Sequence, residues 1–226
     1  MSSLPPEPPP PSPGAAGLPW EERDRRGFFP SLLDTMGLFV SRPAEAWART
    51  RLTGDLGSPL LFGVLVSWFS LALHRVLIAA IAMPILPGFL GRRFGMMAPL
   101  AGVGIITHII LLPFVIAIGL FLVTAILHFC CLIVGALTGT PSGFEGSFRV
   151  VAYAQVANLA AVIPIVGHFI AFVWWVVLAV MGIQRLHQTT QGKAIAAVLI
   201  PIVVCCGSLL FLGMLVGAAF LTRMAH

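Results

Sequence analysis

Long apolar runs, separated by short polar segments, fill the chain from residue 55 to its end. A membrane-spanning helix needs roughly 20 apolar residues. Four runs provide about that length, at residues 59–83, 148–165, 167–186 and 194–221. Each of these runs predicts one spanning helix.

A further apolar run, from Met96 to Leu137, is too long for one straight span. At about 1.5 Å per residue it would extend about 60 Å, twice the hydrocarbon thickness of a bilayer. Either its first part lies in the interface and residues 108–137 cross, or a hairpin near Pro113 makes two spans. Pro113 has no polar turn residues around it, which favours the single span. The sequence then predicts an all-α, polytopic membrane helix bundle with five transmembrane helices.

Proline, glycine and polar residues mark the expected ends of these helices. Pro84 and Pro87 predict that the first spanning helix ends near Met83. Polar segments with glycine at residues 138–147 and 184–193 predict loops.

The first 54 residues have a different composition from the rest of the chain. Proline, serine, glycine and alanine dominate the start, which predicts a disordered cytoplasmic tail over residues 1–27. Residues 28–54 mix apolar and polar positions and predict amphipathic or interfacial helices. Residues 55–226 form the predicted bundle.

The amphipathic segment predicts two short helices. The first carries apolar residues at helical spacing and has Ser31 as its expected N-cap. The second follows Pro43 and covers residues 44–51. We expect this segment to lie in the headgroup layer or to dock on the bundle. The apolar positions are Leu32, Leu33, Met36, Phe39 and Val40.

Charged residues make up only 9% of the chain, against 58% apolar residues and a mean hydropathy of +1.01. Soluble domains carry about 25% charged residues, so lipid must be the solvent for most of this surface. The net charge of +5 is scattered and the chain has one tyrosine, so no nucleic-acid partner is expected.

The distribution of basic residues predicts the orientation. With five spans and a cytoplasmic N-terminus, nine basic residues lie inside and four on the opposite side, where the C-terminus then lies. The inside set is Arg23, Arg25, Arg26, Arg42, Arg49, Arg51, Arg149, Arg185 and Lys193, and the outside set is Arg75, Arg92, Arg93 and Arg223.

Motifs of catalytic chemistry are missing from the sequence. It contains no HExxH, no GxSxG and no P-loop, and its carboxylates all lie outside the predicted spans. We therefore expect no enzyme activity and no cofactor. His108 and His128 are candidate intramembrane polar groups. His128 shares a helix face with Cys131, as metal ligands could, but hydrogen bonding to a neighbouring helix is the favoured interpretation.

Seven residues near the cytoplasmic surface are candidates for contact with a partner or lipid: Asp55, Pro59, Glu145, Arg149, Tyr153, Arg185 and His187. They are either helix caps and topology anchors, or a docking surface for a protein partner or anionic headgroups. Glycines in the last span, Gly213 and Gly217, and alanines in the third permit close helix packing. This packing occurs either within the chain or between copies in a homo-oligomer.

Several segments resemble the Yip domain family of polytopic, Ypt/Rab-interacting-type membrane proteins. They are SRPAEAWART, DLGSPL with Pro59, FRVVAYAQVANLAAVIP with Tyr153, and GIQRLHQTTQGKA, within residues 35–220. In DLGSPL the glycine is transposed, and Ala152 replaces the glycine before Tyr153. The resemblance implies a five-helix bundle with a cytoplasmic N-terminus. Eukaryotic members are associated with Rab-type GTPases, whereas this short-looped sequence looks like the bacterial branch, which implies the bacterial inner membrane.

The combined prediction is a non-enzymatic scaffold or membrane-organising factor that binds a protein partner or lipid at its cytoplasmic face. The alternative is a small channel or transporter, because such proteins use spans broken by proline and glycine at their substrate sites.

Overall fold

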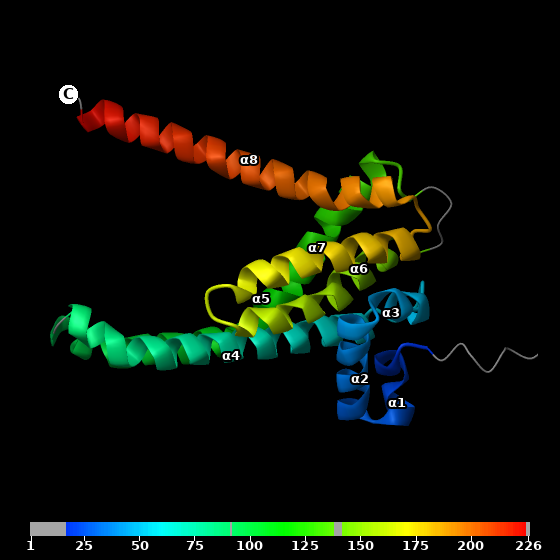
Figure 1. Ribbon diagram of the computed structural model, residues 1–226, viewed down its shortest axis with the longest axis horizontal. Helices are drawn as coiled ribbons and strands as arrows, with labels where there is room; N and C mark the ends of the chain where they lie inside the picture. Colours follow the sequence, from blue (N-terminus) through cyan, green and yellow to red (C-terminus); the bar gives the residue numbers. More distant parts are fainter. Residues whose placement is uncertain (1–16, 91, 138–141, 225–226) are drawn as a thin grey trace, which may run out of the picture. The chain divides into compact units, whose positions relative to one another are not determined.

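The computed structural model describes residues 17–90, 92–137 and 142–224, which are helical apart from short connections and contain no β-strand (Figure 1). The chain divides into two compact units, Met1–Arg51 and Leu52–His226. The first unit contains η1 (Pro19–Glu22), α1 (Arg23–Arg26), α2 (Phe28–Ser41) and α3 (Pro43–Arg49). The second contains α4 (Gly57–Leu90), α5 (Arg92–Ile133), α6 (Gly143–Ala154), η2 (Gln155–Val162), α7 (Gly167–Leu186) and α8 (Gln191–Met224).

The first unit has a small core of its own. Trp20, Phe39 and Trp47 are almost fully buried, and the rings of Phe39 and Trp47 lie 4.9 Å apart. The Trp20 amide donates to Thr35 Oγ1 at 2.9 Å, which ties η1 to α2. Helical structure therefore begins at Pro19, so the tail predicted for residues 1–27 extends too far. Residues 1–16 lie outside the described residues.

The face of α2 that turns inward differs from the expectation. Ser31 is not the N-cap: the cap position is Gly27, with φ 88°, and Ser31 Oγ donates back to the Gly27 carbonyl at 2.6 Å. Ser31 and Thr35 are buried, while Leu33 and Val40 are exposed. The small hydroxyl side chains let α2 approach its neighbours closely, and part of its apolar face is left on the surface.

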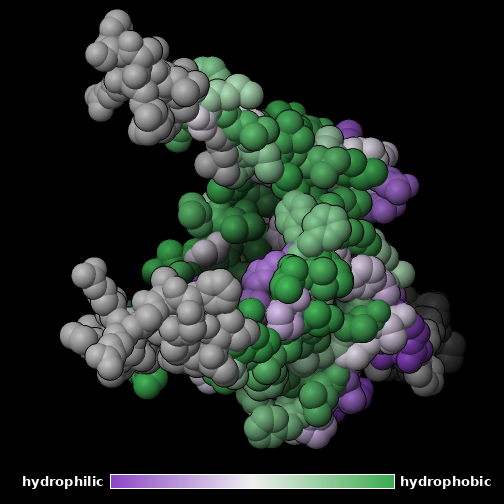
Figure 2. All heavy atoms as spheres, turned by 60° about the vertical axis from the view of Figure 1, so that its left-hand side comes forward, coloured by the Kyte–Doolittle hydropathy of each residue, from purple (hydrophilic) through white to green (hydrophobic). Residues whose placement is uncertain are grey.

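Four described helices are long and apolar enough to cross a membrane: Gly57–Ile81, Ile109–Ile133, Gly167–Leu186 and Gln191–Leu215. Their outward side chains are mostly apolar, and the face of the molecule seen in Figure 2 is dominated by hydrophobic residues. Such a surface is stable only against lipid, which confirms a polytopic helical membrane protein.

The third predicted span, residues 148–165, is not one regular α-helix. It is formed by α6 and by η2, which continues it as a 3-10 helix. At about 1.5 Å per residue in α6 and about 2.0 Å in η2, the two together extend roughly 34 Å, close to the thickness of the hydrocarbon core. The alanines of this segment pack as expected, since Ala154, Ala157 and Ala161 are buried.

The segment α6–η2 runs parallel to α4. Near the start of α4 the Gly54 amide donates to Glu145 Oε2 at 2.8 Å, and further along the ring of Phe62 lies 5.2 Å from that of Tyr153. Still further, Asn158 Nδ2 donates to Ser67 Oγ at 3.0 Å. Residues of α4 thus meet residues of α6–η2 in the same order along both segments.

The other helices alternate in direction. α5 runs antiparallel to α4, because Trp68 Nε1 donates to the Ile109 carbonyl while Leu120 lies against Gly63. α7 returns along α6–η2, from Gly167 beside Ala160 to its end at Leu186. α8 begins next to the end of α5, where Lys193 Nζ donates to the Gly135 carbonyl at 2.9 Å.

Two expectations about helix ends need correction, and one open choice is settled. α4 continues through Pro84 and Pro87 to Leu90 instead of ending near Met83. The predicted loop 138–147 is shorter, since α6 begins at Gly143. α5 is one unbroken helix through Pro113, which excludes the hairpin.

Candidate functional site at the polar end of the bundle

Polar side chains gather where α4, α6 and α8 begin and α5 and α7 end, a region we call the polar end. Asp55 caps α4: its carboxylate accepts from the Gly57 amide at 2.7 Å, the Ser58 amide at 3.0 Å and Ser58 Oγ at 2.8 Å. These bonds satisfy N–H groups that a helix N-terminus leaves without partners. Pro59, in the first turn of α4, is buried.

Arg149 joins the start of α6 to the segment before α4. Its side chain is only 1% exposed, and Nη2 donates to the Asp55 carbonyl at 2.9 Å. One turn earlier, Glu145 accepts from the Gly54 amide. A buried guanidinium needs hydrogen-bond acceptors such as the Asp55 carbonyl. Arg149 therefore holds the cap of α4 in place and does not face solvent.

A hydrogen-bonded chain of two histidines and two serines joins the ends of α5, α6 and α7. His128 Nδ1 lies 3.0 Å from Ser147 Oγ, which lies 3.0 Å from His187 Nε2. His187 Nδ1 lies 3.1 Å from Ser142 Oγ, which donates to the Leu186 carbonyl at 2.8 Å.

For a neutral His187, the carbonyl at the end of this chain sets the direction of each hydrogen bond. The Ser142 hydroxyl donates its hydrogen to the Leu186 carbonyl. Its oxygen therefore accepts a hydrogen bond from His187 Nδ1–H. Nε2 of the neutral His187 then accepts from Ser147, whose oxygen accepts from His128 Nδ1–H. Both histidines and both serines thereby take part in joining the helix ends.

Burial keeps His187 in this neutral form. Its side chain is 1% exposed, and desolvation, with a smaller contribution from the charge that His128 would carry, lowers its pKa to about 4. The site therefore stays uncharged at neutral pH, and it carries a proton only in acid.

The seven residues expected to contact a partner or lipid lie close to this end, with different exposures. Asp55 and Arg185 are exposed and Glu145 is half-buried. Pro59, Arg149, Tyr153 and His187 are buried, so their side chains form no part of an exposed surface and serve the packing of the bundle instead. Contact with a partner stays a prediction for the first three.

The histidines within the spans are placed unevenly. His128 belongs to the chain described above, whereas the side chain of His108 lies outside the described residues. His74 and His168, at the opposite end of the bundle, stack edge-on with ring centroids 4.5 Å apart. In the described part of the chain, no group of three or more His, Cys, Asp or Glu side chains could hold a metal ion.

A polar trio about three turns into α4 was not predicted from the sequence. Ser67 Oγ donates to Gln155 Oε1 at 3.1 Å, and Asn158 Nδ2 donates to both Gln155 Oε1 and Ser67 Oγ. The trio lies where α6 becomes η2. The polar residues of "YAQVANLA" were the available signal, because an apolar span seldom carries two amides so close together.

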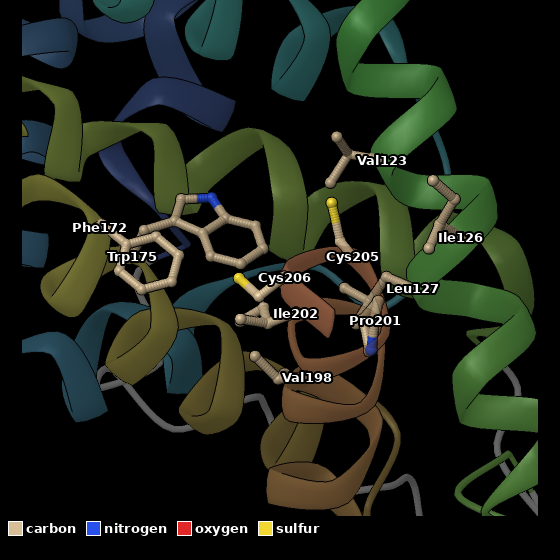
Figure 3. Close-up of a pocket in the computed structure, with 10 residues that line it drawn as sticks. All are labelled: Val123, Ile126, Leu127, Phe172, Trp175, Val198, Pro201, Ile202, Cys205 and Cys206. Atoms are coloured by element: carbon tan, nitrogen blue, oxygen red, sulfur yellow. The ribbon is translucent and has the colours of Figure 1, made fainter. Parts of the chain in front are cut away.

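An apolar pocket of about 290 Å³ opens between α5, α7 and α8 (Figure 3). Pro201, Cys205 and Cys206 form the α8 side, opposite Phe172 and Trp175 of α7. With no charged side chain in its lining, this pocket offers packing and no acid–base chemistry. On the same helix, a side chain at Gly207 or Gly213 would meet nothing within 4 Å, so the within-chain packing expected for Gly213 is not found.

The described helices, their lipid-exposed apolar faces and their polar end define a multi-pass helical membrane protein. The chain belongs to the Yip1 family, since the Yip1 domain matches residues 36–222. No curated protein and no solved structure gives a significant match. The resemblance inferred from the short motifs is thereby confirmed.

Proposed function

We propose that this chain is a non-enzymatic Yip-type scaffold, or membrane-organising factor, that binds a protein partner or lipid at its cytoplasmic face. The observation that supports this most is the construction of the polar end. Side-chain hydrogen bonds of Asp55, Arg149, His187 and Lys193 join helix termini there into one fixed platform. Arg185 remains exposed on that platform.

The proposed orientation has five crossings, with the N-terminus in the cytoplasm and the C-terminus on the opposite side. The parallel course of α4 and α6–η2 supports this orientation. A segment of roughly 34 Å that lies parallel to a spanning helix is long enough to cross the bilayer beside it. Three basic residues lie at the polar end, Arg149, Arg185 and Lys193, against Arg75 about 27 Å further along α4, which favours a cytoplasmic polar end. We place the protein in a bacterial inner membrane, because its short loops resemble the bacterial branch of the family.

Charge reversal at Arg185 tests the docking surface. Arg149 is unsuitable for this purpose, because reversing a buried charge would disturb the bundle itself. We expect in-membrane crosslinking with mass spectrometry to recover a partner protein or a second copy with the native chain, and to recover less with Arg185→Glu. The matched control is Arg25→Glu, also an exposed arginine but one that does not belong to the polar end. Equal recovery from Arg185→Glu and the native chain would contradict a role for Arg185 in docking.

A small channel or transporter is the second candidate, and one observation favours it. The change from α-helix to 3-10 helix at Gln155, beside the Ser67–Gln155–Asn158 trio, resembles the interrupted helices that transporters place at substrate sites. A Ser67→Cys variant without the native cysteines tests it. Modification by a water-soluble, membrane-impermeant thiol reagent would support a hydrated path, and protection from both sides would contradict one.

A further inference from the structure

The first unit carries a groove that has no role in the bundle. It has a volume of about 630 Å³ and lies along α2, with Leu38 in its buried wall. Its lining combines apolar residues, including Leu33 and Val40, with one carboxylate and three arginines, so its charged side chains carry a net positive charge. The charged residues are Asp34, Arg26, Arg42 and Arg49. We call it the arginine groove.

The apolar side of the groove continues into an exposed stripe. Phe29, Leu33 and Val40 recur on one face of α2 and are 71%, 62% and 53% exposed. Ser31 and Thr35 occupy the buried side of the same helix. A helix that turns its hydroxyls inward and its large apolar residues outward requires a non-aqueous surface over the outer face.

The arginines on the groove form ion pairs that are exposed or partly exposed. Arg26 Nε contacts Glu22 at 3.0 Å, Arg42 Nη1 contacts Glu45 at 3.1 Å, and Arg49 also binds Glu45. Exposed pairs of this kind contribute little to stability. Each guanidinium carries five N–H donors and uses one nitrogen in its ion pair, so donors remain for a phosphate, which arginine binds in bidentate fashion.

A bilayer lies within reach of this unit for covalent reasons. The unit ends at Arg51, and the first spanning helix begins at Gly57. Six residues of extended chain cover at most about 20 Å. The groove is thus held close to phospholipid headgroups, at a high effective concentration.

We propose that the arginine groove binds one membrane phospholipid. The phosphate lies against Arg42 and Arg49, and an acyl chain lies along Leu33 and Val40. The apolar stripe enters the outer acyl layer, and the groove selects lipids that carry a phosphate. This site deepens the proposed function and rests on it, because it names the lipid class that the cytoplasmic part of the scaffold would hold.

Gly37 provides the means to block the groove without disturbing the fold. It lines the groove, and a side chain built on it meets nothing within 4 Å. Gly37→Phe should therefore fill the groove, whereas Gly37→Ala adds one methyl group and serves as the matched control. Arg25, an exposed arginine outside the groove lining, provides the control for general electrostatic attraction.

Native mass spectrometry of the full-length protein in detergent tests the site, with dioleoyl-phosphatidylglycerol and dioleoylglycerol as probes. We expect one phosphatidylglycerol to bind roughly tenfold more tightly than dioleoylglycerol, as a charge-assisted phosphate contact requires. Gly37→Phe and the double variant Arg42→Gln/Arg49→Gln should abolish that preference, while Gly37→Ala and Arg25→Gln should keep it. Far-UV circular dichroism verifies that each variant retains its helices.

Three results would overturn the proposal: equal binding of the two lipids, an unchanged preference in Gly37→Phe, or an equal loss in Arg25→Gln. A photoreactive residue at Leu33 distinguishes a protein occupant. Lipid adducts are expected, and an adduct with another protein would overturn lipid as the occupant. Failure of the groove is distinguishable from failure of the scaffold, because the two have different measurements. The lipid preference tests the groove, and equal crosslinking by Arg185→Glu and the native chain contradicts docking.

Discussion

The imidazole of His74 on α4 lies edge-on against that of His168 at the start of α7, with ring centroids 4.5 Å apart. At the start of α4, Arg149 binds the Asp55 carbonyl. Between Gly57 and His74 the helix rises about 26 Å, nearly the thickness of the hydrocarbon core. The chain from Arg149 to His168 covers the same distance beside it. This relationship supports the proposed crossing by α6–η2 in spite of its irregular backbone.

Gly167 is the point at which α7 turns back against η2, and it should not tolerate a side chain. A Cβ there would lie 2.2 Å from the Ala160 carbonyl oxygen, so the backbone must shift. We expect Gly167→Ala to reduce the free energy of unfolding by about 1–3 kcal/mol, the usual effect of overpacking. Thermal unfolding in detergent measures the change.

The matched control is Gly119→Ala on α5, where a side chain meets nothing within 4 Å. Because alanine favours helix over glycine, this variant should be as stable as the native chain or slightly more stable. A similar loss in both variants would show that helix propensity, rather than the close approach at Gly167, determines the result.

Removal of the Arg149 side chain should loosen the start of α4. Arg149→Met leaves the Asp55 carbonyl without its buried donor, which costs about 1–3 kcal/mol in the free energy of unfolding. Arg185→Met changes an exposed arginine at the same end and should alter stability by less than about 0.5 kcal/mol. Denaturant titration compares the two. Equal stability would contradict the structural role assigned to Arg149.

Acid should weaken the junction of α5, α6 and α7 through His187. Burial lowers its pKa to about 4 in the folded protein, against 6.5 for an unperturbed histidine. As the pH falls, the unfolded chain therefore binds the proton first. Stability is complete above pH 6.5 and is lost between pH 6.5 and about 4, by up to about 3 kcal/mol.

Melting temperatures of the native protein and of His187→Gln between pH 7.5 and 4 measure this contribution. Glutamine can still bond to Ser142 and Ser147 but does not titrate, so its curve should fall less steeply below pH 6.5. Parallel curves for the two proteins would assign the acid sensitivity to other groups.

The sequence predicted what apolar run length and charge scarcity determine. It predicted the membrane-embedded bundle, α7 with its observed bounds, and the single helix through Pro113. It missed features that depend on tertiary contacts. Nothing local shows that Ser142 and Ser147 meet His187, or that Gly27 rather than Ser31 begins α2. Proline was also given too much weight, because α4 continues through Pro84 and Pro87, and α8 contains Pro201.

The seven candidate contact residues show the same limit. Polarity near a predicted membrane surface selected residues that lie close together at the polar end of the bundle. It did not separate Arg185, which is exposed, from Arg149 and His187, which are buried. That distinction depends on which hydrogen-bond partners the folded chain provides. A variant of Arg149 therefore tests the stability of the bundle, whereas a variant of Arg185 tests docking.

The side of the membrane on which the C-terminus lies tests the five-crossing bundle most directly. Fusions of green fluorescent protein and alkaline phosphatase after His226, expressed in a bacterial inner membrane, report the cytoplasmic and opposite sides. Fusions after Lys193, before α8 crosses, provide the internal reference. We predict fluorescence at Lys193 and phosphatase activity at His226. Phosphatase activity at Lys193 with fluorescence at His226 would mean that α6–η2 does not cross, and would contradict the account.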